Sequence, residues 1–233
     1  MSPEGTDFLY PFIEADEHDV GALLSDLAAS ATGKAAESAR LRDLTLEALR
    51  TDLDEAGRAL ADRFVAGARL YTFGNGGSST DAASMAALFG QAPSGVALPA
   101  RSLVADQAVL TAIGNDVGYE LTFSRQLIAF ANAPDIAMGY STSGNSENVI
   151  RAFEEAKRRD LLTVGFAGYE GGQMAACDAL DHCFIVRSHS VHRIQETQAA
   201  LSYRLWETVQ DCLAPGGERP EPHGLRLEPE EAR

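Results

Sequence analysis

Two glycine-containing turns, each between a strand-like run and a helix-like run, constrain this chain more than any other feature. The first, Gly74-Asn75-Gly76-Gly77-Ser78, follows the apolar run Leu70–Phe73, and the second, Ser141–Ser146, follows Ile136–Tyr140. Glycine lets backbone N–H groups approach a ligand closely, and a helix N-terminus carries unpaired donors and a positive partial charge. Both turns therefore indicate an anion, such as a phosphate, at the start of a helix.

The segments around these turns alternate between strand and helix patterns. Strands are predicted at Arg69–Phe73, Asp135–Tyr140, Leu162–Ala167 and Cys183–Val186, with two short apolar pieces on either side of Pro99 and a long amphipathic helix over Val191–Cys212. This alternation predicts an α/β fold with a mostly parallel sheet covered by helices on both faces. Ligands of such sheets bind at the carboxyl ends of strands, where both glycine turns lie.

The part of the chain ahead of the first strand is predicted to be helical. One helix is expected near His18–Ala28 and a long one from Glu37 to Ala66, whose apolar stripe indicates either a core helix or a contact between subunits. We predict an acidic N-terminal segment with one short helix (1–35), one domain that includes the long helix (36–214), and a disordered acidic, Pro-rich tail (215–233).

Composition and charge exclude several classes of function. The 233 residues are 45% hydrophobic, which is enough for one sizeable core. The formal net charge of −15 argues against nucleic acid or an anionic membrane as a direct partner, because both require clustered Lys and Arg. The chain shows no apolar run of about 18 residues and no signal-peptide pattern, so a cytoplasmic protein is expected. Three cysteines without ligand spacing indicate buried thiols in a reducing cytoplasm.

The first turn matches neither common nucleotide-binding motif. A dinucleotide fingerprint would need glycine at Ser79, and a P-loop would need Gly-Lys-Ser/Thr. An ordinary tight turn remains an alternative for this stretch. The second turn is more specific, because four hydroxyl residues surround Gly144, more than a helix cap needs. We call Ser141–Ser146 the phosphate cradle, and since it has no fixed positive charge we expect it to prefer a monophosphate ester.

Together with Gly114-Asn115-Asp116 and Arg193-Ile194-Gln195-Glu196, the two turns resemble the sugar isomerase (SIS) family over roughly Glu37 to Leu213. They look most like its phosphoheptose isomerase branch, which includes a non-catalytic relative that binds the replication initiator DnaA. The resemblance implies a flavodoxin-like, doubly wound αβα sandwich with a five-stranded parallel sheet and N-terminal oligomerisation helices. It also implies a homotetramer or homodimer with pockets near subunit interfaces, and a phosphorylated sugar as ligand.

The same resemblance assigns binding roles to particular residues. By this analogy the phosphate is held by Ser141, Thr142, Ser143 and Ser146. The sugar end is lined by Asn75, Gly76, Ser78, Asn115 and Asp116.

The residues that carry catalysis in the family differ in this chain. The isomerases place a His and a Glu four residues apart on the helix after the first turn, and a Gln and a His eight residues apart on the last long helix. Both pairs converge on a zinc ion, and the Glu and a His also move protons. The first pair falls here on Ser84 and Leu88, and the second on Gln195 and Tyr203. Because only Gln195 remains, we expect no metal and no other cofactor.

Three functions stay open from the sequence. The first is a sugar-phosphate-binding protein with weak or no catalysis that senses a ligand or regulates a protein partner. The second is an active aldose–ketose isomerase on sedoheptulose 7-phosphate or a related sugar phosphate, with a rearranged acid/base set of His192, Gln195 and Glu196. In the alternative interpretation His192 is a loop residue and Glu196 a first-turn helix acid. The third function is a protein-binding scaffold like the initiator-binding relative.

Overall fold

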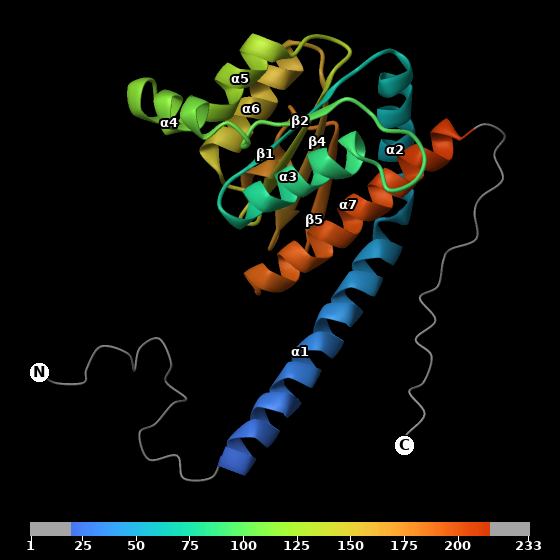
Figure 1. Ribbon diagram of the computed structural model, residues 1–233, viewed down its shortest axis with the longest axis vertical. Coiled ribbons are helices and arrows are strands. Elements are labelled where there is room, and N and C mark those ends of the chain that lie inside the picture. The colour runs from blue at the N-terminus through green and yellow to red at the C-terminus, as the bar shows by residue number, and fades with distance from the viewer. Residues whose placement is uncertain (1–19, 215–233) are drawn as a thin grey trace, which may run out of the picture.

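A five-stranded parallel sheet organises the computed structural model of this protein, which describes residues 20–214 (Figure 1). The strands are β1 (Leu70–Gly74), β2 (Ala100–Ser102), β3 (Ile136–Ser141), β4 (Leu162–Gly168) and β5 (His182–Val186). They lie in the order β2-β1-β3-β4-β5, and every neighbouring pair is parallel. Every residue of β1, β3 and β4 is buried, as expected for strands covered on both faces.

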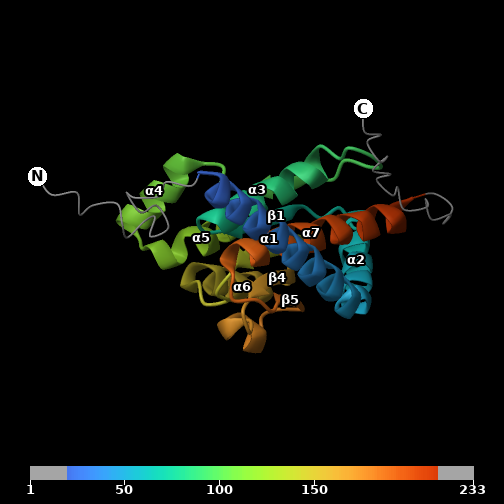
Figure 2. The same cartoon turned by 90° about the horizontal axis from the view of Figure 1, so that it is seen from below.

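Helices cover both faces of the sheet and form a separate apolar core with each (Figures 1 and 2). The first core includes α2 (Arg50–Val65), α3 (Gly77–Gly90) and α7 (Val191–Leu213), and the second includes α5 (Thr122–Phe130) and α6 (Glu147–Arg158). Successive side chains of a strand alternate between the cores: Leu70 belongs to the first, and Tyr71 to the second. The predicted αβα sandwich with a five-stranded parallel sheet is therefore confirmed.

Three smaller elements complete the domain at its periphery. They are α4 (Gln107–Asp116) and the 3-10 helices η1 (Tyr119–Leu121) and η2 (Gly172–Ala176). α4 begins directly after Asp106, whose carboxylate accepts a hydrogen bond from the Val109 N–H at 3.1 Å and so caps the helix. None of the helices within residues 20–214 is long and apolar enough to cross a membrane.

The strand order places a topological switch point between β1 and β3. After β1 the chain moves outward to β2 and then returns to the other side of β1 to form β3. The connections that follow β1 and β3 therefore leave the sheet in opposite directions, and ligands of such sheets bind next to this point, at the carboxyl ends of the strands. The first glycine turn follows β1 and the phosphate cradle follows β3, so both turns lie at the switch point.

The helices ahead of β1 differ from the prediction. Instead of helices near His18–Ala28 and over Glu37–Ala66, the structure has α1 (Val20–Ala48) and then α2, with a break at Leu49. The Ala-rich stretch that was expected to separate two helices continues α1, because alanine has the highest helix propensity. Near the break, the Thr45 hydroxyl bonds the Leu41 carbonyl at 2.7 Å, an interaction that favours bending. Residues 1–19 and the predicted tail, 215–233, lie outside the described residues.

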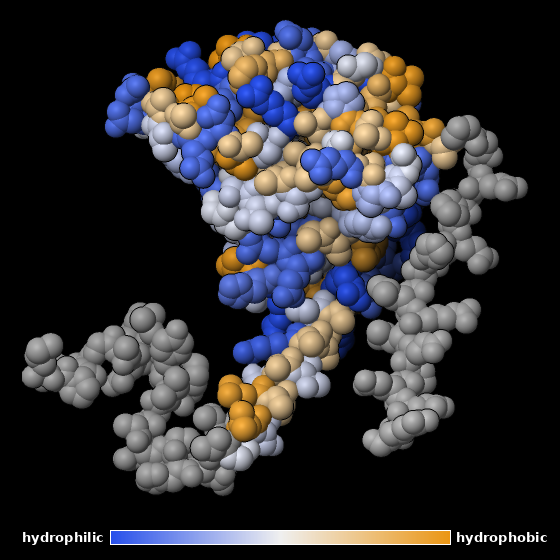
Figure 3. All heavy atoms as spheres, in the orientation of Figure 1, coloured by the Kyte–Doolittle hydropathy of each residue, from blue (hydrophilic) through white to orange (hydrophobic). Residues whose placement is uncertain are grey.

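The N-terminal half of α1 extends away from the body of the domain (Figure 1). Leu24 and Leu27 on this half are 59% and 48% exposed, and apolar side chains are visible on the projecting helix in Figure 3. Further along, an ion pair between Glu37 and Arg193 links α1 to the first turn of α7.

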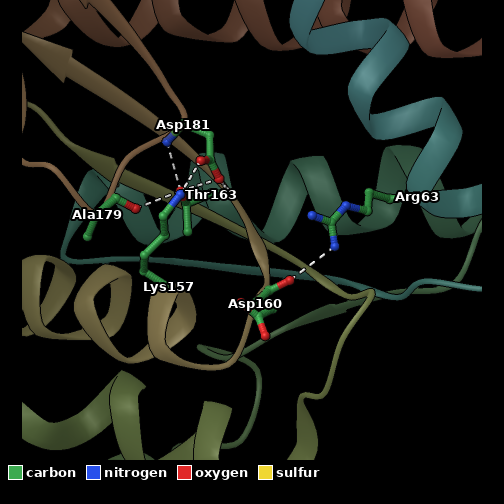
Figure 4. Close-up of polar contacts among 6 residues, drawn as sticks. All are labelled: Arg63, Lys157, Asp160, Thr163, Ala179 and Asp181. Carbon is green, nitrogen blue, oxygen red and sulfur yellow. Dashed lines mark hydrogen bonds and ion pairs between the residues drawn. The ribbon is translucent and has the colours of Figure 1, made fainter.

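The carboxylate of Asp181, in the loop before β5, contacts both α6 and β4 (Figure 4). Asp181 accepts hydrogen bonds from the backbone N–H and the hydroxyl of Thr163, both at 3.0 Å, and pairs with Lys157. Partial burial by itself raises the pKa of Asp181, but Lys157 and the two Thr163 donors outweigh it and lower the pKa below its usual value. In the same view, Arg63 donates to the Asp160 carbonyl at 3.0 Å and so ties α2 to the end of α6.

We expect Asp181→Asn to lower the free energy of unfolding by about 1 kcal/mol at pH 7, because the amide loses the ion pair and part of the Thr163 contact. The folded-state pKa lies below the unfolded value, so this stabilisation is present above about pH 4 and is lost as the pH falls through the folded pKa. Urea denaturation at pH 7 and pH 3 measures it. The exposed Asp178→Asn is the control, and an equal loss at both pH values would contradict the assignment.

Candidate functional site

The phosphate cradle lies between the end of β3 and the first turn of α6. The hydroxyls of Ser141 and Ser146 are hydrogen-bonded to each other at 2.9 Å. Ser146 occupies the N-cap position of α6, yet its side chain makes no capping hydrogen bond. Its hydroxyl therefore belongs to the cradle rather than to the helix, and the N-terminal end of α6 faces the loop with its positive partial charge.

The loop after β4 supports the cradle from behind. Gly144 has a φ of +66°, and a Cβ at this position would lie 1.9 Å from the Gly171 carbonyl oxygen. The Met174 N–H donates to the Gly144 carbonyl at 3.0 Å, and the Gln173 N–H donates to the Asn145 side-chain oxygen at 3.0 Å. These backbone contacts hold the cradle in its shape before any ligand binds.

The four predicted phosphate-binding hydroxyls meet in this one loop. Ser141 is buried, Thr142 and Ser146 are half-buried, and Ser143 is exposed. The Ser143 hydroxyl accepts the Asn145 N–H at 3.2 Å, which folds the loop back on itself. The cradle is thus buried at Ser141 and open to solvent at Ser143. This arrangement suits a phosphate group whose ester substituent extends outward.

The first glycine turn lies against the beginning of α7. Gly76 has a φ of +54°, and a Cβ at Gly77 would lie 2.3 Å from the Gln195 side-chain nitrogen. Ser78 is buried inside the first turn of α3 and its N–H bonds the Asn75 carbonyl at 3.0 Å. The absence of a side chain at Gly77 therefore lets Gln195 reach the turn, although the two residues are far apart in the sequence.

Asn75 connects the first turn to the cradle. Its amide nitrogen donates to the Asn148 side-chain oxygen at 2.7 Å, and the Asn148 nitrogen donates back at 3.0 Å. Asn148 is buried in the first turn of α6, directly after the cradle. The structure thus brings the two turns together through a pair of reciprocal amide hydrogen bonds.

Asn115 and Asp116, which were predicted to line the sugar end, lie at the C-terminus of α4. Both are exposed, and the Asn115 amide donates to the Asp116 carboxylate at 2.6 Å. Within residues 20–214 these two side chains are hydrogen-bonded to each other and to neither the first glycine turn nor the phosphate cradle. Tyr119, three residues on, provides the connection, since its hydroxyl donates to Asn75 at 2.8 Å.

The candidate acid/base residues are distributed unevenly around the site. Gln195 is half-buried against the first turn, whereas His192 and Glu196 are exposed at the beginning of α7. Within residues 20–214, neither of these two exposed side chains is hydrogen-bonded to the cradle.

The positions that would hold zinc, by the resemblance to the isomerases, carry side chains that are poor zinc ligands. Ser84 is exposed, and Leu88 packs against the first core. The ring of Tyr203 is tilted by 40° to that of Trp206, with ring centroids 5.3 Å apart. Within residues 20–214, no three His, Cys, Asp or Glu side chains are grouped as a metal site requires. A hydroxyl, a hydrocarbon, a phenol and one amide are not the nitrogen, thiolate and carboxylate donors that zinc selects, so this set does not fit the ion.

Asp81 is a site residue that sequence reasoning missed. It lies on α3 facing α7, and its Oδ2 atom is buried without a hydrogen-bond partner among the described residues. Burial raises the pKa of Asp81 to about 6, and the Gln195 amide limits the rise. Its position four residues after Gly77, on the same helix face, is the signal that would have found it.

Comparison with known proteins identifies the family of this chain. The model of the SIS domain matches residues 35–168 of this chain, more than half of its length. The chain belongs to the SIS domain family. Its resemblance to that family in the two turns is therefore confirmed.

Among proteins similar to this SIS domain are several phosphoheptose isomerases. That of Thermodesulfovibrio yellowstonii is 38% identical over 182 residues, which cover 76% of this chain and 88% of the relative. That of Burkholderia pseudomallei is 41% identical over 163 residues, or 67% of this chain and 81% of the relative. The solved phosphoheptose isomerase of Neisseria gonorrhoeae is 33% identical and superimposes with a TM-score of 0.73, covering 78% of this chain and 98% of its own.

We expect Gly144→Ala to lower the free energy of unfolding by about 2 kcal/mol or more, because alanine is strained at positive φ and its Cβ would meet the Gly171 carbonyl. Chemical denaturation measures this loss. The control is Gly90→Ala at the end of α3, where a Cβ would meet nothing within 4 Å. If both variants lose the same stability, the close contact does not constrain the cradle.

Proposed function

We propose that this SIS protein binds a sugar phosphate and has weak or no isomerase activity, so that it acts in ligand sensing or regulation. The observation that carries the proposal is the cradle, where four hydroxyls surround Gly144 at the N-terminal end of α6 and backbone contacts to the loop after β4 set its shape. Backbone N–H groups, hydroxyls and a helix dipole together suit a phosphate dianion.

The type of phosphate follows from the charge and surroundings of the cradle. Residues 141–146 contain no Lys or Arg, so the loop suits one phosphate group rather than a polyphosphate. Asn75, Gly76 and Ser78 follow the end of β1, the strand next to β3, where the sugar of a bound ester would extend. We assign Asn115 and Asp116, at the end of α4, to the same sugar. Similarity to phosphoheptose isomerases supports a phosphorylated sugar as the ligand.

The reduced activity follows from the side chains on α3 and α7. Aldose–ketose isomerisation needs a base that removes a proton beside the carbonyl and an acid that completes the transfer. Ser84, Leu88 and Tyr203 supply neither a zinc site nor such a pair, and losing one acid or base costs about 10²–10⁴-fold in rate. We therefore propose that the site works without zinc or another cofactor.

An active isomerase is the second candidate. Identity of 38–41% to phosphoheptose isomerases favours it, as does Gln195, which lies against the first turn. In this alternative His192, Gln195 and Glu196 form a rearranged acid/base set acting on sedoheptulose 7-phosphate or a related sugar phosphate.

The proposed assembly is a cytoplasmic homotetramer or homodimer, with pockets near the subunit interfaces. The exposed leucines on the projecting half of α1 support it, because burial against a second chain would remove them from water. A surface of this kind also suits the third candidate, a scaffold for a protein partner. Light scattering that finds a monomer at micromolar concentration would contradict the assembly.

We expect sedoheptulose 7-phosphate at a hundredfold excess over its Kd to stabilise the protein by about 2.7 kcal/mol in a thermal-shift experiment. Ser143→Ala should reduce this shift, because it removes a cradle hydroxyl that is open to solvent. Ser94→Ala, at an exposed loop serine, is the matched control. If no heptose or hexose phosphate stabilises the protein and Ser143→Ala behaves like the control, the cradle has no such ligand.

We expect aldose formation from sedoheptulose 7-phosphate to remain near background with or without added zinc, and the purified chain to contain far less than one zinc per subunit. Metal analysis and a coupled turnover assay measure both. The combined variant Ser84→His, Leu88→Glu and Tyr203→His is the positive control for zinc binding. Turnover well above background that Gln195→Ala or His192→Ala abolishes would establish the second candidate instead.

A further inference from the structure

Tyr119 has a hydrogen bond that its exposure does not explain. Tyr119 is 60% exposed, yet its hydroxyl donates to the Asn75 side-chain oxygen at 2.8 Å, across 44 residues of sequence. The preceding Gly118 has a φ of +143°, and a Cβ there would lie 2.5 Å from the Glu120 carboxylate. This backbone conformation, which suits glycine, directs the chain into η1 with Tyr119 beside the first turn.

The segment that carries Tyr119 has little packing of its own. No residue of α4 is buried, and Val117 after it is 48% exposed. The same segment carries Asn115 and Asp116, which we propose for the sugar end. A hydrogen bond from η1 to the first turn therefore contributes more to the position of this segment than it would in a well-packed helix.

The bond from Tyr119 also determines what Asn75 offers to a ligand. A carboxamide has two acceptor positions and two N–H groups. The Asn75 oxygen accepts from Tyr119 and Asn148, and one of its N–H groups donates to Asn148 at 2.7 Å. One N–H group of Asn75 therefore takes no part in this network, and it can donate a hydrogen bond to a hydroxyl or carbonyl oxygen of a sugar.

We propose that Tyr119 is a positioning residue for the sugar of a bound sugar phosphate. Its hydrogen bond orients the Asn75 side chain toward the sugar, and the same bond holds the segment of Asn115 and Asp116 near it. The cradle grips the phosphate independently of Tyr119. Tyr119 therefore determines how strongly the site prefers a sugar phosphate to inorganic phosphate. This inference rests on the proposed binding function and adds a specificity determinant to it.

Titration calorimetry of the full chain with sedoheptulose 7-phosphate and with inorganic phosphate tests the proposal. Tyr119→Phe should weaken binding of the sugar phosphate about fivefold and change binding of inorganic phosphate less than about twofold, since it removes one hydrogen bond at the sugar end. The matched control is Tyr71→Phe on β1. This variant also loses one hydrogen bond, which the Tyr71 hydroxyl donates to the Phe130 carbonyl of α5 at 2.8 Å. Both affinities of this control should stay within about twofold of the unsubstituted protein.

A double-substitution cycle separates orientation from a general effect on stability. If Tyr119 acts through Asn75, Tyr119→Phe should weaken sugar-phosphate binding no further in an Asn75→Ala background. Equal weakening for both ligands, no weakening for either, or full additivity with Asn75→Ala would each overturn the role of Tyr119 and leave the binding function standing. If the unsubstituted protein binds neither ligand, the proposed function itself fails, and this inference fails with it.

Discussion

The close approach of two loop backbones, at Gly144 and Gly171, is the constraint on which the site depends. A Cβ at Gly144 would lie 1.9 Å from the Gly171 carbonyl, so the loops after β3 and β4 meet with no space for a side chain. Parallel strands bring their carboxyl ends to one edge of the sheet, and this contact sets the spacing of the loops there. The close contact limits how far the backbone that carries the cradle hydroxyls can move toward the loop after β4.

Binding and catalysis have different physical supports in this protein. The cradle depends on backbone conformation and on hydroxyls of one loop, whereas the candidate acid/base residues His192, Gln195 and Glu196 are side chains of α7. That helix meets α3 where Gln195 lies over Gly77 and where the Oδ2 atom of Asp81 is buried. Because the two supports are separate, side chains such as Leu88 on α3 and Tyr203 on α7 take no part in the contacts that shape the cradle. This separation is the physical basis of the function that we propose.

Particular elements show how far the sequence could predict the structure. The alternation of apolar runs predicted the parallel sheet, and the resemblance of the turns predicted the family; both are confirmed. The predicted bounds of the helices ahead of β1 were wrong, because the alanines of residues 29–36 continue α1 through the gap left between the two predicted helices. The placement of the four cradle hydroxyls in one loop was predictable, since they are neighbours in sequence. The roles assigned to the predicted binding and acid/base residues remain predictions.

By itself, the sequence determined the features that are local: strand ends, glycine turns, the hydroxyl-rich loop and the residues at each helix position. Only the tertiary structure decided which distant groups meet. Asn75 and Asn148 are 73 residues apart, and Asn75 and Tyr119 are 44 apart, yet they form one network. The raised pKa of Asp81 likewise requires α7 to pack against α3. The physical reason is that hydrogen bonding and desolvation act over a few ångströms, a proximity that chain folding creates and residue spacing does not reveal.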